Sequence, residues 1–162
     1  MRMPIIPNLW FDSQAEEAAE FYCSVFPDSR VLDVARYTEL GPGPAGTVMT
    51  VEFQLAGQRF VGINGGPQFP FTEAVSFQIT CADQAELDRY WNALLAGGGQ
   101  ESECGWLKDR YGLSWQVVPE GMAEMMADPD PERVRRAMAA MFGMRKIDVA
   151  ALRAAADGVP VG

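Results

Sequence analysis

The 162-residue chain contains no histidine. Without imidazole it cannot form a Ser-His-Asp or Cys-His catalytic arrangement, and it has no histidine to act as a general base. It also lacks one of the main ligands of catalytic zinc, which leaves carboxylates and thiolates as the strong metal-binding groups. The absence of this one residue type excludes the histidine-dependent hydrolases and metalloenzymes.

Cysteine is scarce, with three residues at Cys23, Cys81 and Cys104. An odd number without close spacing argues against both a disulfide framework and a zinc site. We expect three reduced thiols that pack as small apolar groups, and one reactive thiol is the alternative.

Long apolar runs and basic residues are also few. The N-terminal stretch is interrupted by Pro4 and Pro7, so it does not form the apolar core of a signal peptide. No segment approaches the ~20 apolar residues of a membrane span. The chain has 13 Lys+Arg against 22 Asp+Glu, and this net charge of −9 disfavours nucleic acid and anionic membranes as partners. We therefore expect a cytoplasmic protein that binds neither.

What is present predicts a single α+β domain, residues 1–162, built from a repeated unit. The first unit, residues 1–66, begins with a predicted strand at 5–11. A helix then starts at a Ser13/Glu16 capping box, and three more strands follow at 30–39, 47–55 and 58–64. The second unit, residues 72–119, repeats this order with a strand at 74–81, a helix that starts at an Asp83/Glu86 box, one or two short strands within 100–108, and a closing strand at 113–119. Two βαβββ units in tandem indicate an internal duplication.

The character of the chain changes after Pro119. Residues 120–158 are rich in Met and Ala and predict a helical extension, with helix starts at Asp130 and Asp148. The methionines are expected to pack against the core or a partner subunit, and a promiscuous ligand groove is the alternative.

Two predicted strands of the second unit alternate between polar and apolar residues. Ser76, Gln78 and Thr80 alternate with apolar neighbours, and so do Ser114 and Gln116. By strand periodicity the apolar face meets the helix and the polar face lines a cavity. This predicts a hydrogen-bonding ligand surface without fixed charge, although a satisfied polar core or dimer contacts would give the same pattern. Trp10 and Trp106 could stack on a flat ligand or belong to the core.

Three segments resemble the vicinal oxygen chelate superfamily, and within it the PhnB-like branch that is often labelled a demethylubiquinone methyltransferase domain. They are LWFDSQAEEAAEFYCSVFPDS (9–29), FVGINGGPQFPFTEAVSFQITCADQAELDRYW (60–91) and CGWLKDRYGLSWQVVP (104–119). The tail from 128 to 155 also looks similar to this branch. The resemblance implies that each unit forms half of an open, sided barrel around a cavity, in a homodimer.

The resemblance also maps the positions where superfamily enzymes hold a metal. They fall at Pro7 or its neighbour Asn8, near Ser76, at Gln116, and within residues 61–64, where Asn64 lies. Neutral amides and hydroxyls do not hold a transition metal alone, so we expect no metal and no cofactor. The predicted ligand-binding residues are Asn8, Trp10, Asn64, Ser76, Gln78, Trp106 and Gln116.

The leading functional hypothesis is a binding protein for an unidentified small organic molecule. The alternative is a metal-independent lyase or isomerase whose base is a cavity carboxylate, with candidates Glu52, Glu73, Glu101 and Glu103. A third possibility is an interaction module that uses the helical tail. Methyltransferase activity is disfavoured, because the chain lacks the Gly-rich strand-to-helix loop and the ribose-binding acid of such enzymes.

Overall fold

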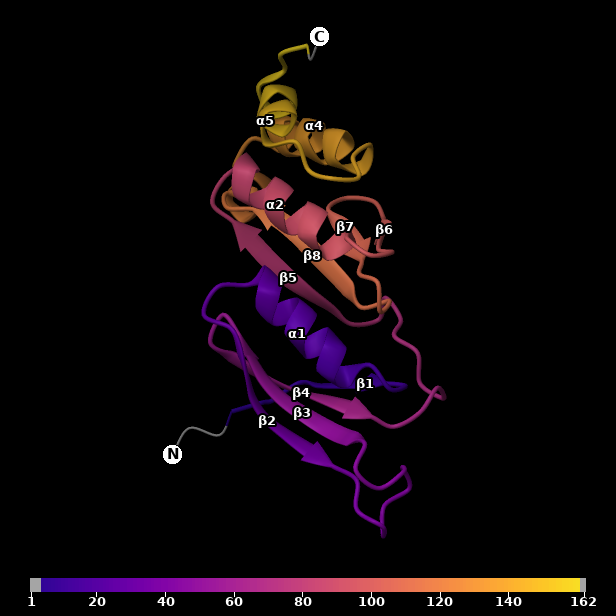
Figure 1. Ribbon diagram of the computed structural model, residues 1–162. Helices are drawn as coiled ribbons and strands as arrows, with labels where there is room; N and C mark the ends of the chain where they lie inside the picture. Colours follow the sequence, from indigo (N-terminus) through magenta and orange to yellow (C-terminus); the bar gives the residue numbers. More distant parts are fainter. Residues whose placement is uncertain (1–3, 161–162) are drawn as a thin grey trace. The chain divides into compact units, whose positions relative to one another are not determined.

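The structure is a computed structural model that describes residues 4–160. The chain divides between Phe71 and Thr72 into two compact units. Each unit contains one four-stranded sheet, and in each a helix covers one face of the sheet (Figure 1). Among the described residues neither sheet closes on itself.

The first unit has the predicted βαβββ order. Its elements are β1 (Asn8–Phe11), α1 (Ala15–Val25), β2 (Arg30–Arg36), β3 (Val48–Leu55) and β4 (Gln58–Asn64). The strands lie in the order β1-β4-β3-β2, with β1 parallel to β4 and the other pairs antiparallel. β1 and β2 are shorter than predicted.

Helix α1 packs on this sheet through small residues and one tyrosine. Ala15, Ala18 and Tyr22 are fully buried. Gly62 of β4 allows the helix to approach closely, because a Cβ there would lie 3.1 Å from the Cβ of Ala15. The ring of Tyr22 on α1 then stacks on the ring of Phe53 on β3, with centroids 6.3 Å apart.

The start of α1 differs from the prediction. Ser13 does not cap the helix: Gln14 is the N-cap residue, and its side chain makes no capping hydrogen bond. Instead, Oδ1 of Asn64 accepts from the Ala15 N–H at 2.8 Å. The predicted capping box was wrong because a side chain from the end of β4 supplies the acceptor, and a local pattern cannot reveal such a distant partner.

The second unit repeats the same topology. Its elements are β5 (Ser76–Cys81), α2 (Gln84–Leu95), β6 (Gln100–Glu101), β7 (Trp106–Lys108) and β8 (Ser114–Pro119), in the strand order β5-β8-β7-β6. The predicted capping box is confirmed, because Oδ1 of Asp83 accepts from the Glu86 N–H at 2.9 Å. The shared strand order, with a parallel first and last strand in each sheet, confirms the duplication.

The turn before β8 is held by a buried carboxylate. Asp109 is 3% exposed, and its Oδ1 accepts from the N–H groups of Tyr111 and Leu113. Its Oδ2 accepts from the indole N–H of Trp115 at 2.9 Å. The residue therefore stabilises the hairpin from within.

The tail forms three helices that belong to the second unit. They are α3 (Met122–Met126), α4 (Pro131–Phe142) and α5 (Val149–Asp157), and α4 and α5 lie side by side (Figure 1). The N–H groups of Cys104 and Gly105 donate to the carbonyls of Met144 and Arg145, both at 2.8 Å. Ile147 is fully buried. None of the helices in residues 4–160 combines the length and the apolar character that crossing a membrane requires.

Candidate functional site: a cavity on the second sheet

A cavity of about 810 Å³ lies on the face of the second sheet that α2 leaves free. The sheet contributes Gln78, Thr80, Trp106, Gln116 and Val118. The tail contributes apolar side chains, chiefly Met122, Met126, Met141 and Phe142. The volume falls within the range of pockets that hold small organic molecules.

The strand register explains why the polar side chains gather here. Gln116 of β8 pairs with Gln78 on one side and with Trp106 on the other, and paired residues share a face of the sheet. Nε2 of Gln116 donates to Oγ of Ser76 at 2.9 Å. The structure thus brings together four predicted ligand residues, Ser76, Gln78, Trp106 and Gln116, with Ser76 acting as a support for Gln116.

The hydrogen-bonding capacity of this surface is largely unused. Three of the four tryptophans donate their indole N–H within the protein: Trp10 to Gly66 O at 2.9 Å, Trp91 to Glu101 at 3.1 Å, and Trp115 to Asp109 at 2.9 Å. Within residues 4–160 the indole N–H of Trp106 has no acceptor, and the side chains of Gln78 and Thr80 have no partner either. Gln78 and Thr80 are exposed and Trp106 is half-buried, so a ligand or water can reach these groups and bond to them.

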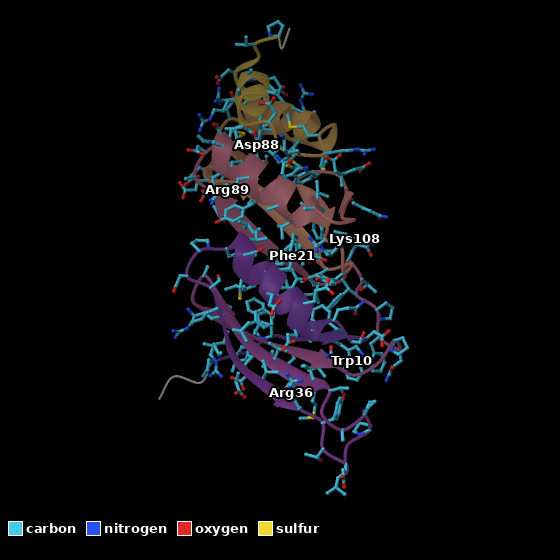
Figure 2. All side chains as sticks on the ribbon, in the orientation of Figure 1. Trp10, Phe21, Arg36, Asp88, Arg89 and Lys108 are labelled. Atoms are coloured by element: carbon cyan, nitrogen blue, oxygen red, sulfur yellow. The ribbon has the colours of Figure 1, made fainter. Side chains whose placement is uncertain are left out.

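The other three predicted residues lie in the first unit and use their polar groups there. Asn8 is exposed and donates to Ile6 O at 3.0 Å. Trp10, labelled in Figure 2, packs over Gly65 so closely that a Cβ at this position would overlap its ring. Asn64 accepts from Ala15 N–H and donates to Val48 O at 3.2 Å. Contact of these residues with a ligand stays a prediction.

Several lining residues escaped the sequence analysis. Cys104, Glu120 and Glu124 line the cavity, and the tail methionines form its apolar wall. The sequence analysis considered the methionines only as packing residues, with a ligand groove as the alternative, and it named none of them as a ligand residue. Nothing local showed that the tail would cover the polar face of the sheet.

The carboxylates proposed as general bases lie elsewhere. Glu52 pairs with Arg59 in the first unit, and Glu101 accepts from Trp91. Glu73 pairs with Lys108, and this hydrogen bond holds the pKa of the Glu73 carboxyl below its ordinary value, the opposite of what a base requires. Glu103 is exposed. In the described part of the chain none of the four lines the cavity.

The mapped metal positions do not fit a metal. Nowhere in residues 4–160 do three His, Cys, Asp or Glu side chains gather as potential ligands. Gln116 and Ser76 are neutral and bond to each other. Such a donor set does not supply the charged or imidazole ligands that hold a divalent transition metal.

The fold of two tandem βαβββ units is the one expected of the vicinal oxygen chelate superfamily. The chain belongs to the family described as 3-demethylubiquinone-9 3-methyltransferase, whose model matches residues 3–118. It is similar to the PhnB protein from Bacillus cereus, at 36% identity and a TM-score of 0.65, over 72% of this chain and 99% of that one. No curated protein matches.

More distant structures share the fold alone. Protein PA1353 from Pseudomonas aeruginosa matches at 22% identity and a TM-score of 0.60, over 74% of this chain and 98% of that one. The fosfomycin resistance protein FosX from Mesorhizobium loti matches at 13% identity and a TM-score of 0.56, over 78% and 98%. Because the family match ends at residue 118, helices α3 to α5 lie outside it. The sheet residues of the cavity therefore lie within the matched region, whereas the methionines of its wall lie beyond it.

Proposed function

We propose that this protein is a cytoplasmic, homodimeric binding protein that holds a small organic molecule in the cavity of the second unit, without a metal. One observation carries the proposal: within residues 4–160 the indole N–H of Trp106 and the side-chain amide of Gln78 have no hydrogen-bond partner, and they lie beside the amide of Gln116, which Ser76 holds in place by a hydrogen bond. A ligand with an acceptor group would complete these bonds, and its apolar part would contact the methionine wall. The homodimer rests on the resemblance to the superfamily.

Methyl transfer is not part of the proposal. Proteins that bind S-adenosylmethionine commonly use a Gly-rich loop that leads from a strand into a helix. Here the run of glycines 97–99 follows α2 rather than preceding a helix. Folds of one superfamily support unrelated chemistries, so the family label alone does not define the reaction.

The proposal is tested by native mass spectrometry of protein purified gently from its own host. We expect a dimer that carries an additional mass of a few hundred daltons, the size range that suits the cavity. Trp106→Phe should lower the occupancy about fivefold, the value of one hydrogen bond. Trp91→Phe is the matched control, because it removes an indole N–H that is bonded to Glu101 outside the cavity lining. Bare protein in every preparation, or equal loss of occupancy in both variants, would contradict the proposal.

A further inference from the structure

From the charges that line the cavity, we infer that its ligand is a flat organic cation, held between Trp106 and the thioether wall with Glu120 and Glu124 balancing its charge. This inference rests on the proposed binding function and adds the class of ligand. It follows from two features of the lining: its carboxylates are unpaired, and it has no basic side chain.

The charge of the lining is one-sided. Glu120 and Glu124 are the acidic residues of the lining, and no Lys or Arg lines the cavity in the described part of the chain. Neither carboxylate has an ion-pair or hydrogen-bond partner among residues 4–160. An anionic ligand would meet two negative charges without compensation, whereas a cation would be attracted.

Other carboxylates of the second unit form ion pairs with basic side chains. Asp88 pairs with Lys146 at 2.9 Å, and Asp128 and Asp157 both pair with Arg133, at 3.0 and 2.7 Å. The second unit therefore has enough basic residues to neutralise carboxylates, yet none of them forms an ion pair with Glu120 or Glu124 within residues 4–160; Lys146 and Arg153 line a separate pocket on the other side of Glu120. The cavity keeps its negative charge available.

The apolar part of the lining suits the same ligand class. Trp106 is half-buried, and indole has the ring face that attracts cations most strongly among the aromatic side chains. Met122, Met126 and Met141 present polarisable thioethers that contact aromatic rings favourably. A flat cation can thus use the indole, the sulfur atoms and the carboxylates at once.

The test compares two fluorescent aromatic probes of opposite charge, the cation thioflavin T and the anion 1-anilinonaphthalene-8-sulfonate, on the full chain. Cys104 reports the location of binding, because it lines the cavity and is half-buried. Bound thioflavin T should slow the alkylation of Cys104 by iodoacetamide at pH 8. Cys81 is the internal reference, because burial raises the pKa of its thiol to about 11 and keeps it unreactive.

Variants then test the role of the two carboxylates. We expect the double variant Glu120→Gln/Glu124→Gln to weaken thioflavin T binding by about 25-fold, or about fivefold for each charge pair near 4 Å in water. The double variant Glu103→Gln/Glu132→Gln makes the same change in net charge outside the cavity lining and should have little effect. An equal loss in both would overturn the assignment of Glu120 and Glu124.

The failures are distinguishable. Tighter binding of the anion with protection of Cys104 would overturn the charge preference and leave the binding function standing. If neither probe protects Cys104 at millimolar concentration, both the cation and the proposed binding function are contradicted.

Discussion

The two units of this chain share a strand order but use their polar side chains in opposite ways. In the first unit, Asn64 bonds to Ala15 and Val48, its carbonyl accepts from the hydroxyl of Tyr37 at 2.6 Å, and Trp10 donates to Gly66. In the second unit, the corresponding sheet face leaves Gln78, Thr80 and Trp106 without partners in the described part of the chain. The named polar groups of the first unit thus bond within that unit, although Asn64 also lines a smaller pocket of about 500 Å³, whereas those of the second unit line the larger cavity without protein partners in the described residues.

The helical tail accounts for much of this difference. It packs on the second unit and adds an apolar wall opposite the polar sheet face. A duplicated scaffold with an appended segment can gain a site in one copy while the other copy keeps a structural role. The following substitutions test this division, in order of decreasing expected effect.

Ile147→Ala should produce the largest change, because Ile147 anchors the tail. Its side chain is fully buried, and its Cγ1 would lie 3.1 Å from a Cβ placed on Gly105. We expect a loss of about 3 kcal/mol in the free energy of unfolding of the second unit, typical of a buried Ile→Ala change. Urea denaturation measures the loss, and hydrogen exchange should show faster exchange in α3 to α5 than in α1.

Val159→Ala is the matched control, since Val159 is an exposed aliphatic residue of the same tail. It should change the stability by less than about 0.5 kcal/mol. If Ile147→Ala speeds exchange equally in both units, the tail is not a specific part of the second unit.

Much of this architecture could be predicted from the sequence. The alternation of polar and apolar residues placed Gln78 and Gln116 on one sheet face, and the Asp83/Glu86 pattern located the start of α2, because both signals are local. The start of α1 could not be predicted in the same way. Its acceptor is Asn64, and the contact depends on β4 lying beside the first turn of the helix.

The sequence predicted only the part of the candidate site that depends on local patterns. Strand periodicity fixes which side chains share a face, and this selected the floor of the cavity. The wall depends on where the tail folds back, through bonds such as Cys104 N–H to Met144 O. Glu120 and Glu124 lie at this junction, so neither the alternation nor the family resemblance identified them.

Asn64→Ala should have the next largest effect, about 2 kcal/mol, because it removes a helix cap and a second hydrogen bond from a half-buried site. The equivalent change in the second unit, Asp83→Ala, should cost about 1 kcal/mol, since it removes a cap at an exposed position. Urea denaturation of both variants gives the comparison. Asn64→Ala should leave the affinity for thioflavin T unchanged; weaker binding with unchanged stability would instead support the ligand role predicted for Asn64.

Two serines of the second sheet form a smaller matched pair. Ser76→Ala should cost about 1 kcal/mol, because Nε2 of Gln116 loses its acceptor. Oγ of Ser114 is buried without a hydrogen-bond partner in the described structure, so Ser114→Ala should be neutral or slightly stabilising. The thermal midpoints of the two variants should therefore shift in different directions or by clearly different amounts. Equal destabilisation would show that Ser114 has a bonding role comparable to that of Ser76.

The smallest expected effect is a difference in acid sensitivity between the units. Asp128 accepts from the Asp130 N–H and pairs with Arg133, and these contacts lower the pKa of its carboxyl. Arg135 lowers the pKa of Glu132 in the same way. A group with a lowered pKa in the folded state stabilises the protein above its unfolded pKa, and this contribution is lost as the pH falls through the folded pKa.

Acidification below about pH 4, near the ordinary range of carboxyl groups, should therefore loosen α4 before α1. The first turn of α4 is also capped by the carboxylate of Asp130, whereas α1 is capped by the neutral amide of Asn64. The groups are exposed, so the effect should be modest and should shrink in high salt. Hydrogen exchange at pH 7 and pH 3.5 measures it, and Asp128→Asn should reduce the difference because it removes one titrating group. Simultaneous loosening of α1 and α4 would show that the two units respond to acid as one.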